Sequence, residues 1–201
     1  MIEIDNILDA EKYISDLDAV IFDLDDTLYS EKQYVKSGYR KIAESFKIPE
    51  LADEMWSVFE SGGKAIDEVL ERHSLTAAKD EALHIYRFQT PDIKLYPGVR
   101  QMLSRMKNVG IITDGRPEGQ KAKLRALELD YPTIITDELG GMEYRKPNPR
   151  AFELMVKQLG VQYEKACYIG DNIKKDFIAP EKLCMRCIWF KNSDGLYSAI
   201  R

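Results

Sequence analysis

Three acidic side chains, Asp23, Asp25 and Asp26, follow directly after the apolar run Ala19–Phe22. Carboxylates this close together raise one another's pKa, and burial raises it further. A divalent cation would relieve the repulsion, and Mg²⁺ prefers carboxylate and carbonyl oxygens as ligands. The same run is also typical of an acid-rich helix N-cap, because Asp and Thr are common capping residues. The segment by itself leaves both interpretations open.

A hydroxyl and a turn stand at the end of a second apolar run. Thr113, Asp114 and Gly115 follow Val109–Ile112 directly. A turn of this kind can point main-chain N–H groups at an oxyanion. We therefore expect Thr113, Asp114 and Gly115 to bind an anionic group of a substrate.

A lysine and two further acids complete the set of reactive side chains. Lys146 begins the segment Lys146–Pro149, whose two prolines stiffen the chain around a single ammonium. Asp171 follows the apolar run Ala166–Ile169, and Asp176 lies five residues further on. Each feature alone could be a loop or a cap. Together they offer the nucleophile, cation and acids that phosphoryl transfer requires.

The elements that must position these residues follow from hydrophobic periodicity. Short apolar runs without polar alternation indicate strands that are buried on both faces. They occur at Ala19–Phe22, Val109–Ile112, Thr133–Thr136, Ala166–Ile169 and Met185–Phe190. Amphipathic helical patterns lie between them, for example over residues 99–106 and 152–159. This alternation predicts an α/β fold with a doubly wound parallel sheet, in which ligands bind at the carboxyl ends of the strands.

The stretch from residue 30 to residue 93 breaks the alternation, because it carries four successive helical patterns and no strand signal. We expect a discontinuous core, residues 1–29 and 94–201, with residues 30–93 as an inserted helical cap over the reactive edge. The basic and aromatic candidates for contact with a substrate in this region are Lys32, Tyr34, Lys36, Arg40, Lys64, Arg87 and, after the cap, Arg116. Residues 5–16 suggest an additional leading helix packed on the sheet.

Composition restricts the functional class. With 201 residues, 44% of them hydrophobic and 31% charged, the chain is globular rather than disordered. It carries 29 Lys and Arg against 34 Asp and Glu, a net charge of −5. There is no basic field to gather phosphate backbones, which argues against nucleic-acid and anionic-membrane partners.

The N-terminal sequence and the cysteines indicate a cellular compartment. Acids stand where a signal peptide would be basic, and no apolar run approaches the roughly 18 residues that span a bilayer. Three cysteines, an odd number without a framework pattern, fit a reducing environment. We therefore expect a cytoplasmic protein, monomeric or a small homo-oligomer.

The order of the reactive residues resembles the four motifs of the haloacid dehalogenase superfamily. The chain has Asp-x-Asp-x-Thr from Asp23, then Thr113, then Lys146, then Gly-Asp-x-x-x-x-Asp from Gly170. The resemblance covers about residues 17–29 and 94–192 and implies a Rossmann-like catalytic core. The helical insert resembles the small helical cap of that superfamily.

The resemblance also implies a role for each matching residue. Asp23 would be the nucleophile, Asp25 the general acid and base, Thr113 the phosphate-binding hydroxyl and Lys146 the lysine that neutralises phosphate charge. Mg²⁺ would be the cofactor.

The implied metal ligands are three. They are the carboxylates of Asp23 and Asp171 and the main-chain carbonyl of Asp25. Asp176 would support the site by orienting the lysine or the outer shell of the metal.

Among the activities of this superfamily, Asp25 favours hydrolysis of phosphate esters. A dehalogenase expels halide, which needs no proton, and that branch lacks the second carboxylate. Transport ATPases need membrane helices. The prediction is thus a Mg²⁺-dependent phosphomonoesterase that hydrolyses a small phosphorylated metabolite, a nucleotide or a sugar phosphate, through an aspartyl phosphate. A phosphosugar mutase and, from another class, a non-catalytic binding protein on the same fold are the alternatives.

Overall fold

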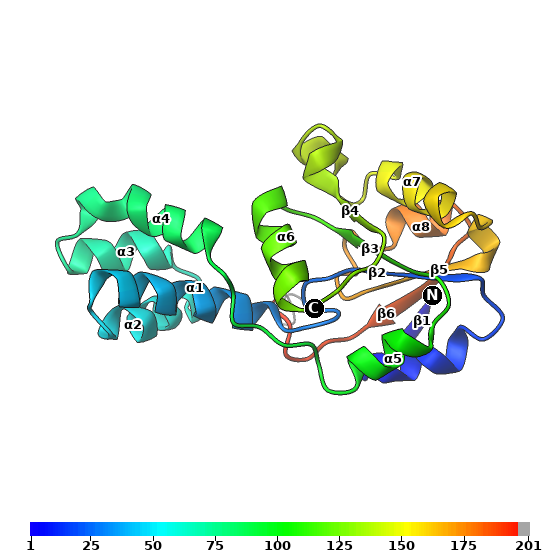
Figure 1. The fold of residues 1–201 in the computed structure, drawn as a ribbon, viewed down its shortest axis with the longest axis horizontal. Helices are drawn as coiled ribbons and strands as arrows, with labels where there is room; N and C mark the ends of the chain where they lie inside the picture. Colours follow the sequence, from blue (N-terminus) through cyan, green and yellow to red (C-terminus); the bar gives the residue numbers. More distant parts are fainter. Residues whose placement is uncertain (197–201) are drawn as a thin grey trace.

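The computed structural model describes residues 1–196 and has two lobes (Figure 1). The larger lobe contains a six-stranded parallel sheet with the strand order β1-β6-β5-β2-β3-β4. Its strands are β1 (Ile2–Ile4), β2 (Ala19–Phe22), β3 (Val109–Thr113), β4 (Thr133–Ile135), β5 (Ala166–Gly170) and β6 (Arg186–Phe190). The chain fills the sheet outward from β2 in both directions, so the predicted doubly wound α/β fold is confirmed.

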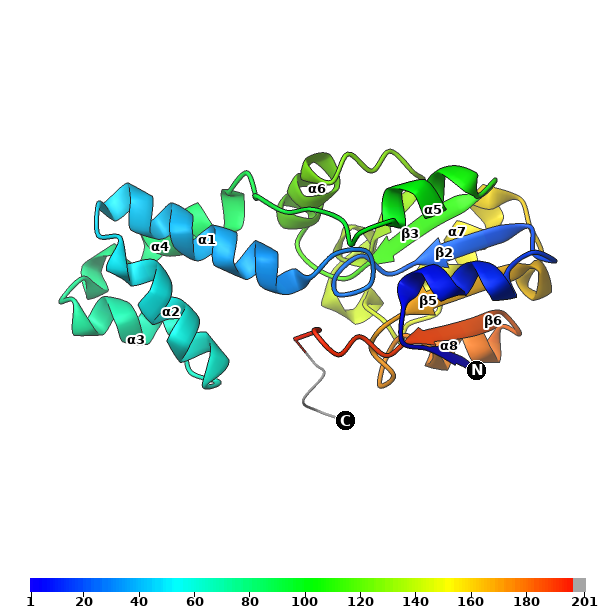
Figure 2. The ribbon, with the colours of Figure 1, turned by 90° about the horizontal axis from the view of Figure 1, so that it is seen from below.

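Helices cover both faces of the sheet, which explains why the strands lack polar alternation. One face packs against η1 (Ile7–Tyr13), α5 (Val99–Arg105) and α6 (Pro117–Ala126), and the other against α7 (Arg150–Leu159) and α8 (Ile178–Lys182) (Figures 1 and 2). Short 3₁₀ turns complete the chain: η2 (Thr76–Ala78), η3 (Thr136–Leu139), η4 (Met142–Tyr144) and η5 (Tyr163–Lys165).

The N-terminal segment differs from the prediction. In place of a helix over residues 5–16, the structure has the edge strand β1, which pairs Ile2 with Ile188 of β6, followed by the 3₁₀ helix η1. A strand of three residues is too short to show a period of two. In η1 the buried residues Ile7 and Ala10 are three apart, the spacing that aligns side chains in a helix with three residues per turn.

The smaller lobe consists of four helices, as the apolar patterns of residues 30–93 predict. They are α1 (Glu31–Phe46), α2 (Glu50–Glu60), α3 (Ala65–Arg72) and α4 (Lys79–Phe88). Each is amphipathic, and their apolar faces meet in a hydrophobic core of the lobe's own, in which Ile42, Leu51, Met55, Val69 and Ala82 are completely buried.

The two chain segments that join the lobes lie side by side. Tyr29, before α1, forms a bridge with Leu95, after α4, and the N–H of Tyr96 donates to the carbonyl of Leu28 at 2.9 Å. The helical lobe therefore extends from the carboxyl end of β2 (Figure 2). Within residues 1–196, no helix is both long and apolar enough to cross a membrane.

Candidate active site

Strand register brings the predicted residues to one edge of the sheet. Phe22, the last residue of β2, pairs with Ile111 of β3 on one side and with Ile169 of β5 on the other. Asp23 comes next and donates its N–H to the carbonyl of Ile169 at 2.8 Å. Thr113 ends β3. The reactive residues of three central strands thus lie at the same carboxyl edge, where open α/β sheets bind ligands.

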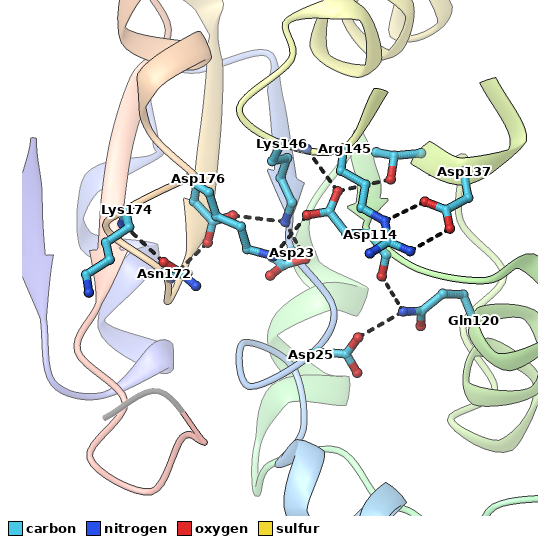
Figure 3. A network of polar contacts seen from close by, with 12 residues as sticks. Asp23, Asp25, Asp114, Gln120, Asp137, Arg145, Lys146, Asn172, Lys174 and Asp176 are labelled. Carbon is cyan, nitrogen blue, oxygen red and sulfur yellow. Dashed lines mark hydrogen bonds and ion pairs between the residues drawn. The ribbon is translucent and has the colours of Figure 1, made fainter. Parts of the chain in front are cut away.

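Lys146 lies between two carboxylates (Figure 3). Its ammonium is 2.7 Å from Oδ1 of Asp23 and 2.9 Å from Oδ1 of Asp176, and it donates to the hydroxyl of Tyr168 at 3.0 Å. The side chain is fully buried. Burial alone would lower the pKa of Lys146, but Asp176 and Asp23 outweigh it and hold that pKa well above its ordinary value. Lys146 is a fixed positive charge beside Asp23.

Three carboxylates gather at this edge. Oxygens of Asp23, Asp171 and Asp176 lie within 4.8 Å of one another. Burial raises the pKa of Asp171 to about 9, with Asp23 and Asp176 adding to the shift. Burial likewise raises the pKa of Asp23 to about 7, although Lys146 opposes it. The cluster needs a further cation to be fully ionised, and its all-oxygen donor set suits a hard ion such as Mg²⁺.

Asp176 contributes differently from the other two acids. Its Oδ1 pairs with Lys146, and its Oδ2 accepts the N–H of Asn172 at 2.9 Å. Both oxygens are therefore engaged within the protein, which fits the supporting role that the sequence predicts. Of the three clustered acids, Asp23 and Asp171 line the small cavity at this edge, and Asp176 does not.

Asp25 faces helix α6. Its Oδ1 accepts from the ammonium of Lys123 at 2.7 Å and from the hydroxyl of Tyr29. Its Oδ2 accepts from Nε2 of Gln120 at 3.0 Å, a contact that Figure 3 shows. Burial would raise the pKa of Asp25, but Lys123 and these hydrogen bonds outweigh it, so that pKa lies below its ordinary value. In this arrangement Asp25 is a carboxylate.

Asp26, the third acid of the run, has a structural role. It lies at φ +52°, and its Oδ1 accepts the N–H of Glu31, the first residue of α1, at 2.8 Å. Its Oδ2 accepts the N–H of Leu196 at 2.7 Å. Asp26 thus binds the first N–H of α1 from outside the helix, whose N-cap residue is Ser30, and Asp23 and Asp25 line the smaller cavity.

The turn after β3 contains Thr113 and Gly115, for which the sequence predicts an anion site. The Thr113 hydroxyl is buried and has no hydrogen-bond partner among the described residues, which suits a group that waits for a ligand. Gly115 has φ +135°, and a Cβ there would lie 2.8 Å from Nε2 of Gln120. Only glycine fits both conditions.

The carboxylate of Asp114 is occupied by the protein itself. Its Oδ1 accepts from the hydroxyl of Thr136 at 3.0 Å and from the N–H of Lys146 at 3.1 Å, and its Oδ2 accepts from Lys175 at 2.9 Å. Asp114 therefore ties the turn after β3 to the segment that carries Lys146.

Sequence reasoning missed two residues of α6. Gln120 and Lys123 are only 4% and 5% exposed, although both are polar. They are three residues apart, so they lie on one face of the helix that follows the Thr113 turn. Two polar residues on the inward face of a short amphipathic helix were the signal that could have found them.

Glu31, at the start of α1, was also missed. Burial and the neighbouring charge of Asp25 raise the pKa of Glu31 to about 8, although Lys123 lies 3.9 Å away. Glu31 is the first residue of α1, and in the sequence it looks like an ordinary first-turn acid, which favours a helix N-terminus.

Two adjoining cavities occupy the edge of the sheet. The smaller, about 230 Å³, is lined by Asp23, Asp25 and Asp171 among others. The larger, about 530 Å³, lies between the lobes. Both are lined by Asp25, Glu31, Asp114 and Arg145. The larger one also takes side chains from the helical lobe, including Tyr34, Tyr39, Lys64, Tyr86 and Arg87.

Known proteins with similar structures support the fold. A subfamily IA hydrolase of the haloacid dehalogenase superfamily from Geobacter sulfurreducens superposes with a TM-score of 0.65, at 18% identity, over 87% of each chain. A hydrolase of that superfamily from Bacillus subtilis, solved with magnesium bound, superposes with a TM-score of 0.61, at 17% identity, over 86% of each chain.

Sequence comparison gives the family. Glyceraldehyde 3-phosphate phosphatases from Pyrococcus abyssi and Pyrococcus furiosus are 28% and 29% identical to the chain, over 86% of its length and 80% of theirs. The family model described as haloacid dehalogenase-like hydrolase matches residues 17–182, which include the ends of β2, β3 and β5 and all four motifs. The chain therefore belongs to the haloacid dehalogenase-like hydrolase family.

Proposed function

We propose that the protein is a Mg²⁺-dependent phosphomonoesterase that acts on a small phosphorylated metabolite through an aspartyl-phosphate intermediate. The observation that carries the proposal is the position of the Asp23 carboxylate. It lines the smaller cavity, and its Oδ1 lies 2.7 Å from the buried ammonium of Lys146. The names of the Pyrococcus relatives support a phosphate ester as substrate and, within that class, favour a short sugar phosphate over a nucleotide.

In the first step, the Asp23 carboxylate attacks phosphorus and displaces the alcohol oxygen of the ester, which splits hydrolysis into two easier displacements. Lys146 opposes the negative charge on the phosphoryl oxygens during this step. The Thr113 hydroxyl, which has no partner among the residues described, donates to one of those oxygens.

Asp25 moves the protons of both steps. As an acid it protonates the departing alcohol oxygen, and as a base it takes a proton from the water that hydrolyses the aspartyl phosphate. Lys123, Gln120 and Tyr29 hold it in the carboxylate form that the second step requires. The acid role in the first step requires this carboxylate to take up a proton first.

The metal would be held by the carboxylates of Asp23 and Asp171 and by the main-chain carbonyl of Asp25. When bound, Mg²⁺ would supply additional charge neutralisation for the transferring phosphoryl group. The repulsion among the buried acids supports this assignment, because a dication offsets it. The magnesium in the Bacillus subtilis structure is a further support.

Substitution of the nucleophile tests the proposal. Asp23→Asn keeps the shape of the site but removes the attacking charge, so release of phosphate from glyceraldehyde 3-phosphate and from an aryl phosphate should fall to background. Asp53→Asn, on the exposed side of α2, is the matched control and should retain full activity. Circular dichroism would confirm that both variants fold.

Two results would contradict the proposal. Substantial turnover by Asp23→Asn would reject the aspartyl-phosphate mechanism. Accumulation of a sugar bisphosphate with little free phosphate would identify a mutase, because a mutase transfers the phosphoryl group to a second hydroxyl instead of to water.

A further inference from the structure

Gln120 presents a buried hydrogen-bond acceptor beside the phosphate site. Its Nε2 donates to Oδ2 of Asp25 at 3.0 Å and to the main-chain carbonyl of Asp114 at 2.6 Å (Figure 3). Because both partners are acceptors, the NH₂ group must face them, which fixes the orientation of the amide. Its Oε1 then points elsewhere, and it is buried without a hydrogen-bond partner among residues 1–196. A buried carbonyl oxygen without a donor is costly, so a donor from a ligand is expected.

Glu31 provides a second polar group in the larger cavity, and its raised pKa favours the protonated carboxyl, which can donate a hydrogen bond. Its N–H is bound to Asp26, but its carboxyl group has no hydrogen-bond partner within the described part of the chain. The nearest cation, Lys123, is 3.9 Å away, which is too far for a hydrogen bond. Glu31 lines both the smaller and the larger cavity, so it lies where the two meet.

The junction of the cavities is where the first carbon atoms of the leaving group must lie. A phosphate at Asp23 occupies the smaller cavity, and the organic part extends into the larger one. Gln120 lines the larger cavity and contacts Asp25, which lines both. A hydroxyl group has one hydrogen and two lone pairs, so it can donate to Oε1 of Gln120 and accept from the carboxyl group of Glu31. A carboxylate or a second phosphate on these carbons would instead meet the negative charge of Asp25 and the acid of Glu31. Arg145 also lines both cavities, but its guanidinium is already paired with Asp137.

Three cations of the larger cavity form no ion pair within residues 1–196, and they do not alter this conclusion. Lys64, Arg87 and Arg116 line the larger cavity but not the smaller one, and all three are exposed. Because they line only the larger cavity, we expect them to raise the local concentration of anionic substrates rather than to select the group beside the phosphate.

We propose, building on the proposed phosphatase activity, that Gln120 and Glu31 bind a hydroxyl group on the carbon next to the ester carbon of the substrate. The preferred substrates are then phosphate monoesters of polyols and hydroxyaldehydes, and the hydroxyl rather than the aldehyde is the group that is recognised. Gln120 has a second role, because it also positions Asp25.

A pair of substrates that differ in this hydroxyl tests the inference. sn-Glycerol 3-phosphate carries it, and 3-hydroxypropyl phosphate lacks it. For the wild-type enzyme with Mg²⁺, kcat/KM should be about 10- to 100-fold higher for the hydroxylated ester, as expected when a site acceptor loses its donor. In Glu31→Met and Gln120→Met the ratio should fall to about one to three. Gln120→Met will also slow both substrates, so the ratio is the measurement.

Glu118→Met is the matched control. Glu118 lines the larger cavity only, is exposed, and lies on α6, so its substitution should leave the ratio unchanged. Equal kcat/KM values for the two esters in the wild-type enzyme would overturn the inference, as would a ratio that survives both substitutions. Preference for phosphoglycolate, whose carboxylate is bonded to the ester carbon, would overturn it too. Hydrolysis of an aryl phosphate by the same preparation separates these results from failure of the proposed function, in which no ester is hydrolysed.

Discussion

At the scale of single residues, we expect the Thr113 hydroxyl to contribute to activity but not to stability. It is buried and has no partner among the described residues, so the folded protein gains nothing from it. Thr113→Val keeps the shape and removes the polar group. We expect the free energy of unfolding to stay the same or rise by about 1 kcal/mol, while kcat/KM for phosphate esters falls about 10-fold or more because a donor to the phosphoryl group is lost.

Thr136→Val is the control for this prediction. The Thr136 hydroxyl is also buried, but it donates to Asp114 at 3.0 Å, so its loss should destabilise the protein by about 1–3 kcal/mol. Urea denaturation of the two variants gives the comparison. A Thr113→Val variant that is as destabilised as Thr136→Val would show that the Thr113 hydroxyl has a structural partner in solution.

The residues that sequence predicts are those whose types stand out at strand ends. Asp23 and Asp171 do so, and the structure places them together with Lys146, which the proline-rich segment before α7 carries. Gln120 and Lys123 could not be assigned in this way, because their role depends on contact with Asp25, which precedes them by 95 and 98 positions. The sequence of a helix does not show that one of its polar residues contacts a residue that is distant in the chain and is brought near only by the fold.

At the scale of elements, the last residue of β5, Gly170, packs closely against the side chain of Asp176 in the loop that follows the strand. A Cβ at Gly170 would lie 2.5 Å from Oδ2 of Asp176. Gly170→Ala would therefore push Asp176 away from Lys146 and from the N–H of Asn172. We expect a loss of about 2–4 kcal/mol in the free energy of unfolding together with reduced turnover, because an ionic network with fully buried members is disturbed.

Gly119→Ala, in α6, is the comparison for Gly170→Ala. The nearest atom to a Cβ there is the hydroxyl oxygen of Tyr34 at 3.4 Å, and alanine favours a helix over glycine. This variant should be as stable as the wild type or more stable by up to about 1 kcal/mol. Thermal unfolding of both variants measures the difference, and a Gly170→Ala variant of wild-type stability would mean that the loop can move at little cost.

The long buried elements were predictable because helices cover both faces of the sheet, so β2, β3 and β5 contain no polar alternation. The edge strand β1 could not be predicted in this way. It has three residues, and what makes it a strand is its pairing with β6, which is nearly the whole chain away in sequence. The local hydrophobic pattern of three residues cannot predict pairing with a strand so distant in the sequence.

At the scale of the whole molecule, the sequence predicts a helical insert over the reactive edge but not which of its side chains face the cavity. Among the candidates in the insert, Tyr34, Lys64 and Arg87 line the cavity, and so does Arg116, which follows the insert. The others have partners elsewhere: Lys32 pairs with Asp194, Lys36 lies over the ring of Trp56, and Arg40 pairs with Asp92. Which side chains face the cavity depends on the relative position of the two lobes, and the periodicity of a single helix cannot predict that position.

The acid cluster also links metal binding to global stability. Asp23 follows β2 and Asp171 follows β5, so a dication held by both joins two central strands and removes the repulsion between buried carboxylates. At a Mg²⁺ concentration of 100 times its Kd, the folded state should gain about 2.7 kcal/mol. For a protein of this size that corresponds to a rise of about 5–10 °C in Tm.

Thermal unfolding across a Mg²⁺ titration, with and without chelator, measures this shift. Asp171→Asn should lose the Mg²⁺-dependent rise, while its Tm without metal should equal or exceed that of the wild type, because one of the mutually repelling buried charges is gone. Asp53→Asn, remote from the cluster on α2, should show the full rise. If the titration curves of Asp171→Asn and the wild type superimpose, the dication does not bind between Asp23 and Asp171, and the excess charge of the cluster must be balanced by protonation instead.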